Sequence, residues 1–185
     1  MSVTDLLAAI DGRIDLASVL WLLPLTFVFH DFEEILKVEN WLCRRGEAVL
    51  DMVPVRFRRF LQDTFRMNTK RFAEDVLWIY TVIFGVTAMA VFFGIYLPYL
   101  AVLAVYFLHV FTHLGQAVVL RMYTPGVTTA VLIALPYSLY AYYRLLSGGV
   151  IGWDDALRGL ALAVLCLPLL AWLVLEGRRR TVNRA

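Results

Sequence analysis

The fold is decided by VLWIYTVIFGVTAMAVFFGIYL, residues 76–97, followed after Pro98 by YLAVLAVYFLHVFTHLGQAVVL, residues 99–120. Neither segment contains Asp, Glu, Lys or Arg. Each is long enough to cross the hydrocarbon of a bilayer, which takes about 20 residues of helix. Because only Pro98 separates them, we expect the two segments to form a tight helical hairpin.

Three further apolar runs, residues 16–36, 127–146 and 156–175, flank this pair. The chain of 185 residues is 61% apolar, and its mean hydropathy is +0.73. A soluble domain of this size cannot bury so much apolar surface. We therefore expect a single all-α membrane domain over residues 1–185, with about five transmembrane helices. The first run is interpreted as a permanent span, because the N-terminus lacks the basic start of a signal peptide.

Lys and Arg lie mainly on one side of the predicted bundle. The segment 37–71 carries nine of the seventeen, and Arg121 with four C-terminal arginines raises the count on that side to fourteen. The other side has three, namely Arg13, Arg144 and Arg158. Since cytoplasmic loops are enriched in Lys and Arg, the N-terminus is predicted outside and the C-terminus in the cytoplasm, in a bacterial inner membrane.

The segment 37–75 is predicted to be a cytoplasmic loop with an amphipathic helix. Its apolar residues recur at i, i+3, i+4 and i+8, opposite several arginines: Phe57, Phe60, Leu61 and Phe65. Such a helix lies on an anionic leaflet or caps the bundle. We expect membrane lipids as partners. Nucleic acid is not expected, because the loop has no recognised fold for binding it.

Ionisable residues inside the predicted spans are concentrated near the cytoplasmic face. His30, Glu33 and Glu34 project from one face of the first span, whereas His109 and His113 lie one turn apart on the third. At 1.5 Å per residue, His30 and His113 both lie roughly 10–12 Å below the cytoplasmic surface. The sequence therefore predicts that the first and third spans bring these side chains to one site.

Three residues near the same face could complete this site. Glu74, at the start of the second span, is expected to join the cluster as a further ligand or base. Arg121 and Tyr123 lie at its mouth, where they could hold an anionic headgroup of a substrate or act as ordinary interfacial anchors. A type II turn is also expected within the sequence Tyr123-Thr124-Pro125-Gly126, with Pro125 at the second turn position and Gly126 at the third, which these residue types suit.

Three interpretations of the cluster remain open. Imidazole and carboxylate are ligands for iron, zinc or manganese, so His30, Glu34, His109 and His113 are candidate ligands for one or two ions, with Glu33 and Glu74 as candidate catalytic groups. A histidine and a desolvated glutamate could instead move a substrate proton without metal. The third interpretation is a structural network in which Glu33 and Glu34 pair with Lys37.

The ordered motifs resemble those of the HxxEE-domain membrane proteins. The match consists of His30-Asp31-Phe32-Glu33-Glu34, then His109 or His113, then Tyr123-Thr124-Pro125-Gly126. The resemblance covers most of the chain, but it implies membership and little mechanism. The zinc motif HxxEH is similar as well, and that analogy implies ligands at His30 and Glu34 with Glu33 as the base.

The leading functional hypothesis is a metal-dependent membrane enzyme that acts on a lipidic or hydrophobic substrate. A site rich in carboxylates with mixed imidazole ligands favours oxidation at non-haem iron over hydrolysis at zinc. A transporter or metal-handling protein is the alternative from another class. It would need polar residues continuing toward the outer face, and the fourth and fifth spans offer few.

Overall fold

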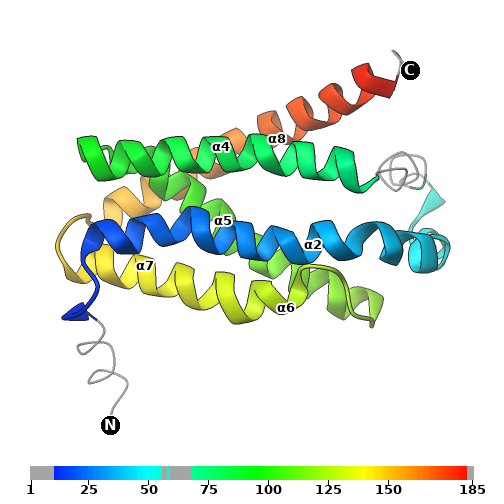
Figure 1. Ribbon diagram of the computed structural model, residues 1–185, viewed down its shortest axis with the longest axis horizontal. Coiled ribbons are helices and arrows are strands. Elements are labelled where there is room, and N and C mark those ends of the chain that lie inside the picture. The colour runs from blue at the N-terminus through cyan, green and yellow to red at the C-terminus, as the bar shows by residue number, and fades with distance from the viewer. Residues whose placement is uncertain (1–10, 56–57, 59–67, 183–185) are drawn as a thin grey trace, which may run out of the picture.

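The computed structural model describes residues 11–55, 58 and 68–182, and its regular elements are helical. In chain order they are α2 (Leu16–Met52), α4 (Thr69–Phe93), α5 (Tyr96–Leu120), α6 (Val127–Thr129), the π-helical segment η1 (Ala130–Ala134), α7 (Leu135–Ser147) and α8 (Trp153–Val182). Because α6, η1 and α7 follow one another directly, the described residues form five helical columns. The predicted all-α architecture is confirmed. In Figure 1, α2 lies between α4 and α7 and crosses in front of α5, while α8 runs obliquely behind.

Within the described part of the chain, α2, α4 and α5 are long and apolar enough to cross a membrane. Their outward faces carry large apolar side chains, such as Trp78 at 75% exposure and Val118 at 74%. Apolar surface of this extent requires lipid as its solvent, so the chain is an integral membrane protein. The fourth and fifth apolar runs are helical over 127–147 and 153–182. That these two also cross the bilayer stays a prediction.

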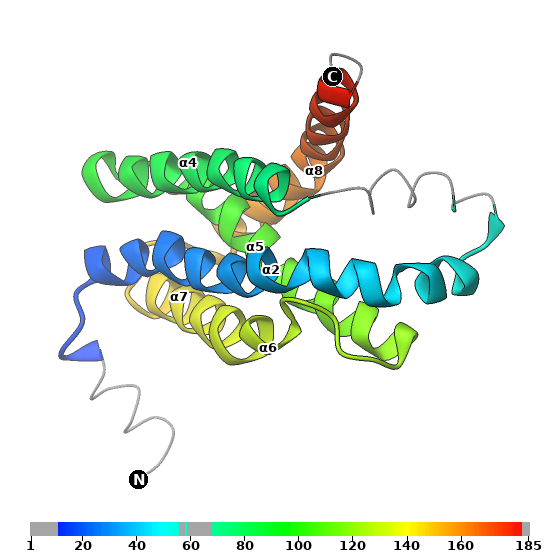
Figure 2. The same ribbon diagram turned by 45° about the vertical axis from the view of Figure 1, so that its right-hand side comes forward.

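The first helix is much longer than the predicted span of residues 16–36. Asp15 caps its start by accepting a hydrogen bond from the Ser18 backbone N–H at 2.6 Å. The helix then continues past Lys37 to Met52, because residues 37–52 contain several strong helix formers. The predicted loop 37–75 thus includes the second part of α2, which projects beyond α4 (Figure 2). The amphipathic helix predicted over 57–65 lies, apart from residue 58, outside the described residues.

The predicted hairpin between the second and third spans is present, but its turn is not at Pro98. The helix α4 ends at Phe93, and Gly94 follows in the left-handed conformation with φ of 68°. Glycine adopts this conformation without the steric cost that a Cβ brings. Pro98 instead lies in the first turn of α5, where the missing N–H has no intrahelical partner to lose.

The turn before α6 matches the predicted type II geometry. Gly126 has φ of 86° and ψ of −20°, and the Val127 N–H donates to the Thr124 carbonyl at 3.3 Å. Further along, η1 precedes Pro136, and the Leu135 N–H bonds the Ala130 carbonyl five residues earlier. This wider π turn relieves the clash between a proline ring and the carbonyl four residues before it.

The core lies between α2, α5 and α7. Val19, Leu20 and Leu23 of α2 are fully buried or nearly so, as are Leu100 and Leu103 of α5. Two buried tyrosines add polar contacts, because the Tyr99 and Tyr137 hydroxyls lie 2.7 Å apart and the Tyr137 hydroxyl donates to the Val19 carbonyl at 3.2 Å. This packing fixes the register of α2 against α5, and therefore the relative positions of their histidines.

Candidate metal centre

Four side chains converge between α2 and α5. His30 and Glu34 come from α2, and His109 and His113 come from α5, so each helix supplies a pair at i and i+4. One ligand atom from each of the four lies within 4.8 Å of the other three. The predicted convergence of the first and third spans is confirmed, and the four residues could hold one metal ion. They are called the His/Glu cluster below.

The imidazoles of the His/Glu cluster are in close contact. The ring centroids of His109 and His113 are 4.3 Å apart, and that of His30 lies 5.2 Å and 4.9 Å from them. The Nε2 atom of His113 lies 2.8 Å from Nε2 of His109 and 3.1 Å from Oε1 of Glu34. Ligand atoms about 2.0–2.2 Å from one ion lie about 3 Å from each other, so these separations fit a shared ion.

Threonine hydroxyls contact the far nitrogen of two of the histidines. The Nδ1 atom of His30 lies 2.9 Å from Thr129 Oγ1, and that of His109 lies 3.3 Å from Thr112 Oγ1. The Nε2 atom of His30 is buried and has no hydrogen-bond partner among the described residues. A buried ring nitrogen needs such a partner, and an ion bound by the cluster would supply it. The donor set therefore fits a divalent metal.

Glu33 lies beside the His/Glu cluster and is held by a separate network. Its Oε2 atom accepts hydrogen bonds from the Thr129 N–H at 2.9 Å and the Thr129 hydroxyl at 2.7 Å. Its Oε1 atom accepts from Lys37 Nζ at 3.0 Å and from the Tyr123 hydroxyl. Burial and this hydrogen bond raise the pKa of Tyr123, which keeps its hydroxyl protonated as a donor. The carboxylate of Glu33 is thus occupied by donors, which makes it a poor base.

The turn formed by Tyr123–Gly126 packs directly on the cluster. A Cβ atom on Gly126 would lie 2.5 Å from His113 Cε1 and 2.6 Å from Glu34 Oε1. Only glycine fits there, both for this reason and because of its positive φ. The projecting part of α2 holds the turn in place, since Trp41 Nε1 donates to the Tyr123 carbonyl at 2.8 Å.

Residues 21–141 match the model of a protein family described as proteins of unknown function with an HXXEE motif. The chain belongs to the HXXEE family. No curated protein and no solved structure matches this chain. The matched residues include the histidines of both α2 and α5 and the segment Tyr123–Gly126, which agrees with the resemblance seen in the sequence.

The structure separates the two glutamates of the HXXEE motif. His30 and Glu34 face the His/Glu cluster, whereas Glu33 binds Lys37, Tyr123 and Thr129. The third interpretation of the sequence, a structural network with Lys37, therefore holds for Glu33, whose Oε1 atom lies 3.0 Å from Lys37 Nζ. The family resemblance left open which of His109 and His113 is the motif histidine, and both of them lie in the His/Glu cluster.

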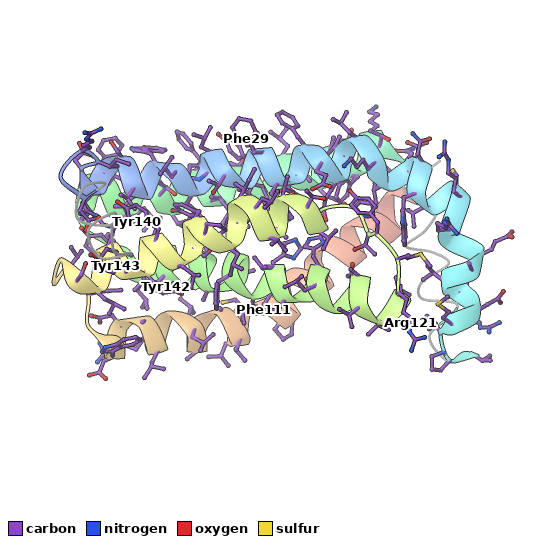
Figure 3. The ribbon with its side chains drawn as sticks, turned by 90° about the horizontal axis from the view of Figure 1, so that it is seen from below. Phe29, Phe111, Arg121, Tyr140, Tyr142 and Tyr143 are labelled. Carbon is purple, nitrogen blue, oxygen red and sulfur yellow. The ribbon has the colours of Figure 1, made fainter. Side chains whose placement is uncertain are left out.

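Three other candidate residues of this HXXEE protein lie outside the His/Glu cluster. Glu74 was expected to join it, but its carboxylate is exposed and faces Lys70 Nζ at 3.9 Å. Arg121 is exposed at the end of α5 (Figure 3). Tyr123 is 44% exposed and contacts Glu33 and Lys37. Contrary to the expectation, Glu74 does not join the His/Glu cluster, because its side chain lies on the exposed face of α4.

Two residues that the sequence did not single out belong to this region. Thr129 joins His30 to Glu33, although 99 residues separate it from His30. No pattern in the sequence indicates this contact. Asp31 is buried, and its Oδ2 atom has no hydrogen-bond partner among the described residues. A carboxylate inside a predicted span is a functional signal by itself, so Asp31 could have been found.

Proposed function

We propose that this chain is a metal-dependent integral membrane enzyme, with iron as the metal and a hydrophobic or lipidic molecule as its substrate. The observation that carries the proposal is the placement of three imidazoles and one carboxylate within 4.8 Å of one another. Each of these groups is expensive to bury in a membrane. A divalent cation would compensate the negative charge of Glu34. It would also bind the lone pair of His30 Nε2, which is buried and has no hydrogen-bond partner among the described residues.

The proposed ligands are the four members of the His/Glu cluster. Two or three imidazoles with one carboxylate are typical of non-haem iron sites, and open positions there give iron its oxidation chemistry. Zinc would support hydrolysis with similar ligands. One ion is proposed and not two, because Glu33 is engaged by donors and Glu74 faces Lys70. Among the described residues, one cluster has the spacing of a metal site.

A hydrophobic substrate is supported by the surroundings of His109. This histidine is partly exposed, and its neighbours Leu108 and Phe111 are 36% and 50% exposed. Figure 3 shows Phe111 directed away from α5. Roughly 10 Å below the surface these side chains meet acyl chains and not water. We propose that the substrate approaches laterally from the bilayer, with Arg121 and Tyr123 near its polar end.

The proposed orientation places the His/Glu cluster near the cytoplasmic face, with the N-terminus outside. It rests on the fourteen-to-three distribution of Lys and Arg. The structure is compatible with it, since α2 ends and α4 begins at the same end of the bundle as the end of α5 (Figures 1 and 2). This end carries the basic segment.

A metal-free acid–base site is the second candidate, and one contact favours it. The His113 imidazole lies 3.1 Å from the Glu34 carboxylate, within the distance at which a proton passes between two groups. In that case Glu34 and His113 would be the acid–base pair, and His30 and His109 would orient them. The metal and metal-free candidates predict opposite results in the same measurement.

The deciding experiment is elemental analysis of protein purified in mild detergent from cells supplied with iron, manganese and zinc. We expect about one equivalent of iron per chain, in line with a single four-ligand site. His113→Ala should release it, whereas Glu47→Gln, an exposed glutamate on α2, should not. Zinc in place of iron would favour hydrolysis. Absence of any stoichiometric metal would overturn the metal proposal in favour of the acid–base site.

A further inference from the structure

We propose that Glu33 and Thr129 form a relay that fixes the tautomer of His30, so that its Nδ1 carries the proton and its Nε2 presents a lone pair to the His/Glu cluster. The geometry of the relay stands by itself. Its consequence for metal binding rests on the proposed function. In this assignment Glu33 and Thr129 are positioning residues, which act on the site through His30.

The donor and acceptor roles in the relay are set by Glu33. Four donors surround its carboxylate: Thr129 N–H, the Thr129 hydroxyl, Lys37 Nζ and the Tyr123 hydroxyl. One of them is a cation with no capacity to accept. The carboxylate is therefore the acceptor in every contact, and it accepts a hydrogen bond from the Thr129 hydroxyl at 2.7 Å.

The donor and acceptor roles of Thr129 in turn decide which nitrogen of the His30 imidazole carries the proton. A hydroxyl has one proton and two lone pairs. The Thr129 hydroxyl lies 2.7 Å from Glu33 Oε2 and 3.3 Å from the Gly126 carbonyl oxygen. Both are acceptors, so its proton is donated away from His30, and the shorter contact is the one to the charged carboxylate. The Thr129 oxygen, 2.9 Å from Nδ1 of His30, can only accept there. Hence Nδ1 must be the N–H of that ring. The lone pair of the neutral imidazole is left on Nε2, which is buried and has no other partner among the described residues.

Local structure explains why Thr129 can make these contacts. Gly126 is the N-cap of α6, which places the Thr129 N–H among the first-turn donors that have no intrahelical acceptor. Glu33 supplies that acceptor from α2, at 2.9 Å. Carboxylates are favourable at this end of a helix. One carboxylate thereby anchors the start of α6 and orients the hydroxyl that contacts His30.

Such contacts are known to tune metal sites in general. Hydrogen bonds to the second ring nitrogen of a ligand histidine fix its tautomer and orientation, and losing them costs about 10–100-fold in metal affinity. The neighbouring Thr128 provides a matched control, because it has the same side chain in the same helix turn and is exposed. Thr128→Val therefore makes the same chemical change away from His30, whereas Thr129→Val removes the contacting hydroxyl and Thr129→Ser keeps it.

The first test is ¹⁵N NMR of the histidine rings in metal-stripped protein. The chain has three histidines, and loss of a signal in His30→Gln assigns the ring of interest. We expect His30 to carry its proton on Nδ1 in the wild type and to lose this preference in Thr129→Val, with Thr129→Ser restoring it. Protonation on Nε2 in the wild type would overturn the relay, whether or not the protein binds metal.

The second test is titration of the same variants with iron(II). Thr129→Val should bind about 10–100-fold more weakly than the wild type, while Thr129→Ser and Thr128→Val should bind as the wild type does. An unchanged affinity in Thr129→Val would overturn the inference and leave the metal proposal standing. If the wild type bound no metal, the proposed function would fail, and the NMR result would still decide the relay. Should Thr129→Val not fold, the relay is tested by the tautomer of His30 in the wild type and by the same NMR and iron(II) measurements on Glu33→Gln.

Discussion

Glu34 Oε1 lies 3.1 Å from His113 Nε2, which joins the last glutamate of the HXXEE motif to a histidine on another helix. Only 14% and 4% of these two side chains are exposed. Both groups are therefore largely shielded from solvent at this contact. Of the two adjacent glutamates, Glu34 thus lies inside the His/Glu cluster, whereas Glu33 lies beside it.

The charge of Glu34 should be essential for metal binding. Glu34→Gln keeps the size of the side chain but removes the anionic ligand, so we expect the affinity for iron(II) to fall by more than about 100-fold, beyond the effect of an outer contact. Titration in detergent measures this loss. Glu47→Gln serves as the control, because Glu47 is exposed on the same helix. Wild-type affinity in Glu34→Gln would contradict the assignment of Glu34 as a ligand.

Gly126→Ala should damage both stability and the site. The new Cβ would lie 2.5 Å from His113 Cε1, and a φ of 86° adds about 1–2 kcal/mol of strain for a residue with a Cβ. We expect a larger loss of stability than strain alone explains, together with weaker metal binding. Denaturant unfolding and iron(II) titration report the two effects separately.

Two other glycines control for these effects. Gly94 has a φ of 68° with nothing within 4 Å of an added Cβ, so Gly94→Ala should show the strain without the damage to the site. Gly115 lies inside α5 with open space around it, and Gly115→Ala should be neutral or slightly stabilising, by up to about 1 kcal/mol. If Gly126→Ala behaved as Gly94→Ala does, the contact with the cluster would be unimportant.

Replacing Glu74 should have almost no effect. Its carboxylate is exposed and faces Lys70 at 3.9 Å, and such surface pairs contribute about 0–1 kcal/mol. We expect Glu74→Gln to retain the metal content of the wild type and its stability within about 0.5 kcal/mol. Elemental analysis and thermal unfolding in detergent test this. Release of metal by this variant would return Glu74 to the site and contradict the arrangement of α4.

The helices and the paired histidines were predictable because each leaves a periodic or compositional signal. Long uncharged runs indicate spans, and spacing at i and i+4 on two spans at equal depth indicates a shared site. Helix ends were less predictable. Gly94 and not Pro98 makes the turn of the hairpin, and α2 continues past Lys37, because a charge ends an apolar run without ending a helix.

Rotation about the helix axis was the main uncertainty within the site. Glu33 and Glu34 lie on opposite sides of His30 by about 60° and 40° on an ideal helix, so either could have faced α5. Packing of α6 against α2 decides between them, because the N–H and the hydroxyl of Thr129 both donate hydrogen bonds to Glu33. These contacts depend on the fold of a segment 96 residues away, and no local pattern reveals them. Equal depth in the sequence likewise could not indicate that Glu74 lies on the exposed face of α4.

Labelling of Cys43 should settle the proposed orientation. Cys43 is an exposed free cysteine on the projecting part of α2, beside Arg44 and Arg45, whereas Cys166 lies in the apolar run of α8. Because the basic end is proposed to be cytoplasmic, a membrane-impermeant maleimide should modify the protein in inside-out vesicles and not in intact spheroplasts. Cys43→Ser should abolish the labelling, and Cys166→Ser should preserve it. Modification of Cys43 from outside would reverse the topology and place the His/Glu cluster near the outer face.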